Sequence, residues 1–338
     1  MQISGVLCSS VGIGAFTEIG PFKVKEDGKN LDFNQYAWNK EANILFAEFE
    51  IGIGFSYSNK TSDYQTNHFT TTVADTYAFF LNWLQRFPEY KNADVYLVGE
   101  GFSGAIAIHL GQFILQESQY ELNINLKGIA ARNVFIDKET DNNGFIDYAW
   151  SHSLTSDEIY MGIKSNCNFS APKSSKKCDE YIDLMYNVTA DINPYDIYSP
   201  LCNSTSEIDT YLLQGPCSSE YVSDYFNNPA VQIALHANLT DAVPYPWSLC
   251  NVTVGNWTDY PDTSLPIIAE LMAEGIQIWI YNGDLDSATP INSFIIVFPL
   301  MFILISPSNF NHDSSFWDGV GLYDIEAHHD GELRFISE

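Results

Sequence analysis

Residues 99–104 (GEGFSG) join an apolar segment at residues 94–98 to an apolar stretch at residues 105–115. This pattern predicts a strand, a sharp turn and a helix, which together can present a nucleophile at the tip of the turn. The tip residue is Gly101, which has no nucleophilic side chain. Ser103 is expected in the first turn of the helix, where it cannot serve as the nucleophile at the tip. The residues alone leave two interpretations open, a glycine-bearing structural turn and an active site without its nucleophile.

Acidic residues supply two further candidate sites. Asp286 follows a predicted strand, where a carboxylate can orient a catalytic histidine, although aspartates in surface turns are common. Residues 138–147 (KETDNNGFID) partly match a calcium-binding loop, but Trp150 stands where the loop needs a bidentate glutamate. His328 and His329 lack a partner at ligand spacing, so we predict no metal site.

The segments around these residues alternate between strand and helix patterns. One helix is expected over residues 71–87, where Val73, Tyr77, Phe80 and Leu84 are at helical spacing. The expected strands cover residues 43–49, 94–98, 126–131 and 277–281, and the other expected helices cover residues 105–115 and 265–274. This alternation predicts an α/β protein with a mostly parallel sheet flanked by helices.

The middle of the chain differs in character, with many Tyr, Asn, Ser and Cys residues. We therefore expect core residues at 1–144, an inserted lid at 145–249, and the rest of the core at 250–338.

The composition excludes several classes of function. Hydrophobic residues make up 46% and charged residues 17% of the chain, which is typical of a protein with a core. There are 15 Lys and Arg against 43 Asp and Glu, a net charge of −28, which argues against binding to nucleic acid or anionic membranes. The apolar run at residues 294–305 has 12 residues, fewer than the ~20 of a membrane span. A buried element or translated non-coding sequence accounts for it better.

Cysteines and glycosylation sequons indicate an oxidising compartment. None of the six cysteines forms a CxxC pair, so three disulfides are expected. Residues 1–20 lack the features of a signal peptide. Either the natural start is missing, which we favour, or the chain is cytosolic and its sequons are unused. The seven sequons are at Asn59, Asn168, Asn187, Asn203, Asn238, Asn251 and Asn256.

Several motifs occur in an order that is typical of one family. They are residues 14–24 (GAFTEIGPFKV), 43–58 (NILFAEFEIGIGFSYS), 75–90 (DTYAFFLNWLQRFPEY) and 278–286 (IWIYNGDLD). Residues 3–10 (ISGVLCSS) stand where that family reads NGGPGCSS. Over nearly its whole length the chain resembles the serine carboxypeptidase family.

This resemblance implies an α/β-hydrolase fold and a Ser-Asp-His triad that releases C-terminal residues from peptides at acidic pH without a cofactor. The triad aspartate would be Asp286 and the nucleophile position Gly101, where serine is replaced. Residues 331–338 (GELRFISE) resemble the strand before the histidine loop, and the sequence ends a few residues short of that loop. The oxyanion amides would be those of Gly5 and Phe102.

The resemblance also implies a site for the terminal carboxylate of the substrate. Glu18 and Glu100 match the family's acid pair, whose shared proton favours binding at low pH. Ile3 stands where the family has an asparagine. The implied disulfides are Cys8–Cys250, Cys167–Cys178 and Cys202–Cys217.

We therefore expect a serine carboxypeptidase-like protein of the secretory pathway that is inactive or impaired. Loss of a triad nucleophile alone removes nearly all of a roughly million-fold acceleration. Two alternatives stay open: a non-catalytic glycosylated relative that binds peptides, and an active carboxypeptidase of which this sequence is a faulty version. Peptide C-termini are the expected partners, nucleic acid is not, and a homodimer is compatible with the sequence.

Overall fold

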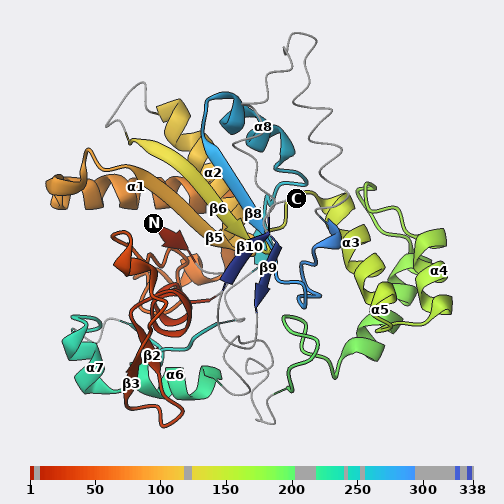
Figure 1. Cartoon of the computed structure of the whole chain (residues 1–338), viewed down its shortest axis with the longest axis horizontal. Helices are drawn as coiled ribbons and strands as arrows, with labels where there is room; N and C mark the ends of the chain where they lie inside the picture. The colour runs from red at the N-terminus through yellow and green to blue at the C-terminus, as the bar shows by residue number, and fades with distance from the viewer. Residues whose placement is uncertain are drawn as a thin grey trace.

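The computed structural model describes residues 1–3, 8–117, 124–201, 218–239, 243–251, 256–293, 324–327 and 333–336. Its centre is a parallel sheet of strands β1 (Gln2–Ile3), β5 (Val95–Glu100), β6 (Leu126–Arg132) and β8 (Gln277–Tyr281), in the spatial order β1-β5-β6-β8 (Figure 1). Glu100 is opposite Arg132, which is opposite Tyr281 on the next strand. The carboxyl ends of three strands therefore meet at one edge of the sheet, where parallel α/β sheets usually carry their sites.

Three apolar helices pack around this sheet. They are α1 (Phe69–Arg86), α2 (Phe102–Glu117) and α8 (Leu265–Ala273). Helix α2 packs on β5 and β6 and also contacts α1 and α8. Val73, Tyr77, Phe80 and Leu84 of α1 are buried, which confirms the helical spacing found in the sequence. The strands and helices expected at 94–98, 105–115, 126–131, 265–274 and 277–281 are all present, with slightly different ends.

The strand predicted over residues 43–49 is wrong. Phe46 makes only an isolated parallel bridge with Gln2. The Gln2 N–H donates to the Leu45 carbonyl at 2.9 Å, and the Ala47 N–H donates to the Gln2 carbonyl at 3.2 Å. In the described part of the chain this segment therefore pairs with β1 at one position and forms no continuous ladder.

The other elements form smaller groups beside the sheet. Figure 1 shows α6 and α7 near β2 and β3, and α3, α4 and α5 on another side. The bounds of the helices are Val11–Glu18 (η1), Trp38–Lys40 (η2), Thr61–Tyr64 (η3), Pro88–Tyr90 (η4), Lys138–Ser151 (α3), Asp157–Asn166 (α4), Lys176–Thr189 (α5), Ser218–Phe226 (α6) and Pro229–Ala234 (α7). Those of the strands are Phe22–Val24 (β2), Leu31–Phe33 (β3), Thr66–His68 (β4), Asn256–Thr258 (β7), Asp324–Ala327 (β9) and Leu333–Ile336 (β10).

Helix α3 bears on two sequence predictions. It contains residues 138–147, so this segment is helical and is not a calcium-binding loop. It also runs through the boundary predicted between residues 144 and 145. Ile146 of α3 packs with Ile163 of α4 and Met185 of α5 in a separate buried cluster. The division into a core and an inserted lid stays a prediction.

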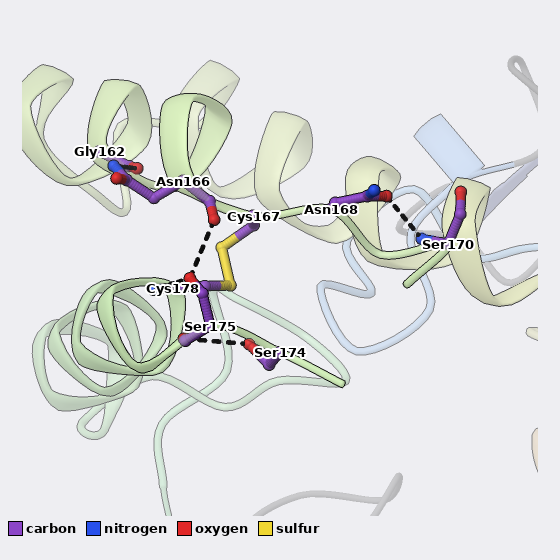
Figure 2. The surroundings of a disulfide bond; sticks show 8 residues. All are labelled: Gly162, Asn166, Cys167, Asn168, Ser170, Ser174, Ser175 and Cys178. Atoms are coloured by element: carbon purple, nitrogen blue, oxygen red, sulfur yellow. Dashed lines mark hydrogen bonds between the residues drawn. A yellow bond between two sulfur atoms is a disulfide. The ribbon is translucent and has the colours of Figure 1, made fainter. Parts of the chain in front are cut away.

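Two predicted disulfides are present. Cys8 and Cys250 are bonded, as are Cys167 and Cys178. Figure 2 shows that the second disulfide joins the end of α4 to the start of α5, where the Ser175 hydroxyl also donates to the Asn166 carbonyl at 3.2 Å. The predicted Cys202–Cys217 pair lies outside the described residues.

Candidate active site at the carboxyl edge of the sheet

The turn between β5 and α2 has the predicted shape. Its tip, Gly101, has a φ of +56°, a left-handed conformation that favours glycine. The Gly101 N–H donates to the Arg132 carbonyl at 2.9 Å, and the Gly104 N–H donates to the Gly101 carbonyl at 3.0 Å. The backbone therefore places residue 101 outward at the start of α2.

The three glycines of this turn are needed for different reasons. A Cβ at Gly99 would lie 2.3 Å from the Ser103 carbonyl oxygen, and one at Gly104 would lie 2.7 Å from the Val134 side chain. Within the described part of the chain, a Cβ at Gly101 would meet nothing nearer than the Asn133 carbonyl oxygen at 4.0 Å. Gly99 and Gly104 are thus required by close packing, whereas position 101 has room for a side chain.

Ser103 is not positioned to replace a nucleophile at the tip. It is 1% exposed in the first turn of α2, as predicted, and it lines a small cavity with Glu48 and Glu50. The Ser103 hydroxyl therefore does not replace the serine hydroxyl that the family has at position 101.

Asp286 lies in the loop after β8 and is buried. The Thr289 N–H donates to its Oδ1 at 2.8 Å. Burial raises the pKa of Asp286 to about 6, against the opposing effects of backbone N–H groups and of Arg132. The Gly283 N–H of the same loop donates to the Asn133 side chain at 3.4 Å, next to the Gly101 turn. The structure thus brings the predicted triad aspartate to the same edge of the sheet as Gly101.

Glu18 and Glu100 come together as predicted, with a third residue between them. Glu18 ends η1, Glu100 ends β5 and Arg132 ends β6. Arg132 Nη1 lies 2.7 Å from Glu18 Oε1 and 3.2 Å from Glu100 Oε1. Burial and the neighbouring Glu18 charge raise the pKa of Glu100 to about 7, although Arg132 opposes this shift. One acid of the pair is therefore protonated under mildly acidic conditions.

Arg132 was missed in the sequence analysis. It is one of three arginines in the chain and ends a strand that is mostly buried (LKGIAAR). A basic residue at the end of a central strand, in a chain of charge −28, was a signal that could have identified it. The Glu100 charge raises the pKa of the Arg132 guanidinium above its ordinary value, so it stays positively charged.

Other predicted site residues have mixed outcomes. Phe102 begins α2, so its N–H is among the helix donors without an intrahelical partner, and its ring packs 4.4 Å from that of Trp257. Gly5 lies outside the described residues. No group of three or more described His, Cys, Asp or Glu residues is placed to hold a metal ion. No helix in the described ranges could cross a membrane, and residues 294–305 lie outside them.

The described sequon asparagines differ in exposure. Asn59, Asn168 and Asn187 are exposed, and Asn168 accepts from the Ser170 N–H at 3.1 Å (Figure 2). Asn238 and Asn251 are half-buried, and the Asn251 side chain donates to the Gly52 carbonyl at 3.0 Å. Asn203 and the side chain of Asn256 lie outside what the structure describes.

Comparisons with known proteins identify relatives of this chain. "Serine carboxypeptidase-like 40" of Arabidopsis thaliana is 43% identical over 295 residues, which cover 85% of this chain and 58% of the relative. "Putative serine carboxypeptidase-like 23" of the same plant is 41% identical over 297 residues, 84% of this chain and 65% of the relative. The chain thus spans about three fifths of the length of these relatives.

A solved structure and a family model complete the comparison. The crystal structure of KEX1(DELTA)P, a prohormone-processing carboxypeptidase from Saccharomyces cerevisiae, matches with a TM-score of 0.71 and 22% identity, covering 87% of this chain and 66% of that one. This similarity confirms the α/β-hydrolase fold. The family model described as "Serine carboxypeptidase" matches residues 5–294. This chain belongs to the serine carboxypeptidase family.

Proposed function

We propose that this chain binds the C-termini of peptides at the carboxyl edge of its sheet and does not cleave them by serine chemistry. The observation that carries the proposal is Gly101 at the tip of the β5–α2 turn, with a φ of +56° and no side chain. This is the position that the family resemblance assigns to the nucleophile. Because the nucleophile alone carries most of a triad's effect, the remaining groups of the site supply little hydrolysis.

The binding part of the proposal is supported by groups that do not depend on a nucleophile. Glu18, Glu100 and Arg132 form a charged cluster next to the turn. The raised pKa of Glu100 gives this cluster a proton at mildly acidic pH, and a protonated acid can donate to a carboxylate. A peptide C-terminus is thus a suitable ligand.

The test uses the full-length protein, purified from a eukaryotic secretory host. Titration calorimetry compares an N-blocked dipeptide with its C-terminal amide at pH 5. The dipeptide acid is then incubated with the protein at pH 4 to 6, with and without a fluorophosphonate. We expect saturable binding of the acid, weaker binding of the amide, no hydrolysis, and no adduct on residues 99–104 by peptide mass spectrometry. Fluorophosphonate-sensitive hydrolysis, or equal binding of acid and amide, contradicts the proposal.

A second candidate function is an active carboxypeptidase whose natural sequence has serine at position 101. The observation that favours it is the open space around Gly101, since the nearest described atom to a Cβ there is 4.0 Å away. Sequencing the full transcript through codon 101 decides this point. A glycine codon rules the candidate out, and a serine codon replaces the first proposal with it.

We also propose that the protein passes through the secretory pathway and carries glycans. The Cys8–Cys250 and Cys167–Cys178 disulfides and the exposed sequons support this. Treatment of the protein from its natural source with peptide N-glycosidase should lower its apparent mass. An unchanged mass contradicts this part of the proposal.

A further inference from the structure

Arg132 lies within the acidic end of the central sheet. Its two ion pairs, with Glu18 and Glu100, both use Nη1. A guanidinium carries three further N–H donors on Nε and Nη2. The Arg132 side chain is 33% exposed, compared with 12% for Glu18 and 18% for Glu100. The arginine is therefore the most accessible member of the cluster, and the two acids hold it in place.

The position of Arg132 relative to the turn is also fixed by the backbone. Its carbonyl accepts from the Gly101 N–H at 2.9 Å, and its strand pairs with β5 up to the Glu100–Arg132 position. The guanidinium itself lies 3.2 Å from Glu100, the residue before the tip, so a peptide C-terminus that approaches the tip of the turn also approaches this guanidinium.

We propose that the Arg132 guanidinium, positioned by Glu18 and Glu100, is the group that contacts the terminal carboxylate of a bound peptide. This inference rests on the proposed function and changes the roles within it. The acids are positioning residues, and the arginine is the ligand-binding residue. Its planar fork matches a carboxylate, because two parallel N–H donors can meet the two carboxylate oxygens.

Electrostatics favours this assignment. Two ionised acids alone would repel a third carboxylate, so an acid pair binds such a ligand only after taking up a proton. With Arg132 present the three side chains sum to −1 when both acids are ionised and to 0 when Glu100 is protonated. The other titratable groups whose charges act on this cluster are Tyr281 on β8 and Asp286 in the following loop. Binding should therefore weaken as Glu100 ionises near pH 7 without being lost.

The experiment measures the ratio of the affinities for an N-blocked dipeptide acid and its amide, by titration calorimetry of the full-length protein at pH 5, 6, 7 and 8. The variants are Arg132→Met and the double variant Arg132→Met/Glu18→Gln. The double variant keeps the net charge of the cluster and leaves one acid, Glu100, without its counterion, where the single variant leaves two. Arg86→Met, at the end of α1, is the matched control for loss of an arginine.

We expect the acid-to-amide ratio to fall by about 10- to 100-fold in both Arg132 variants at every pH, which is typical for a lost charge-assisted hydrogen bond. The control should keep the wild-type ratio. A wild-type protein that does not distinguish acid from amide refutes the proposed function itself. A wild-type protein that does, together with a double variant that keeps the ratio, refutes only the role of Arg132. The double variant decides the question if the single variant does not fold.

Discussion

Substitution of the turn glycines tests whether the β5–α2 turn is built as described. Gly101→Ala adds a Cβ where the nearest described atom is 4.0 Å away, so its cost is the left-handed φ of +56°, roughly 1–2 kcal/mol. Gly104→Ala forces a Cβ to within 2.7 Å of the Val134 side chain, an overpacking cost of about 1–3 kcal/mol. Gly99→Ala places a Cβ 2.3 Å from the Ser103 carbonyl oxygen, which belongs to the backbone and cannot rotate away. Its cost should be the largest.

The assay is chemical denaturation of the three variants beside the wild type, followed by intrinsic fluorescence. We expect Gly101→Ala to lower the free energy of unfolding least, Gly104→Ala to lower it more, and Gly99→Ala to lower it most. If Gly101→Ala lowers the free energy of unfolding as much as Gly99→Ala, the space around the turn tip is misjudged. Position 101 then cannot accept a serine without strain either.

Three other predictions concern stability and modification. Burial raises the pKa of Asp141 from its ordinary value near 3.8 to about 7, so folding favours the protonated form of this carboxyl group. The free energy of unfolding should therefore fall as the pH rises from about 4 to 7. In urea titrations across that range, Asp141→Asn should show a smaller fall than the wild type. An equally steep fall in the variant contradicts this prediction. The Cys167–Cys178 disulfide closes a loop with a sequence separation of 11. In the same assay, replacing both cysteines with serine should lower the free energy of unfolding by about 3 kcal/mol. An unchanged free energy would show that the disulfide is dispensable. Asn187 is exposed, whereas Asn251 is half-buried and donates to the Gly52 carbonyl. Peptide mass spectrometry should therefore find higher glycan occupancy at Asn187 than at Asn251. The reverse order would show that burial does not control glycosylation here.

Local pattern was sufficient for most of the sheet and its helices. The spacing of apolar residues in α1 and the apolar runs of β5, β6 and β8 are properties of short segments, and they match the structure closely. The segment at 43–49 has the same apolar character but forms no strand. Whether an apolar segment pairs along its length depends on the segment beside it, and the described contact with β1 is a single bridge at Phe46. That neighbour cannot be found in the segment itself.

The candidate site shows the same distinction. The family resemblance identifies positions 18, 100, 101 and 286 as candidate site positions, because each lies in a recognisable motif. Arg132 lies in no such motif, and its role depends on parallel pairing that brings the ends of β5 and β6 together.

The amino-acid order was thus enough for most of the element types, for the family and for the glycine at the turn tip, and through the family resemblance for two cysteine pairs. Folding was needed to bring Glu18, 114 positions away in sequence, to within 2.7 Å of Arg132. It also distinguished the open position at Gly101 from the crowded ones at Gly99 and Gly104. The physical reason is that motifs reflect local backbone preferences, whereas burial, charge neighbours and free space depend on atoms from distant parts of the chain.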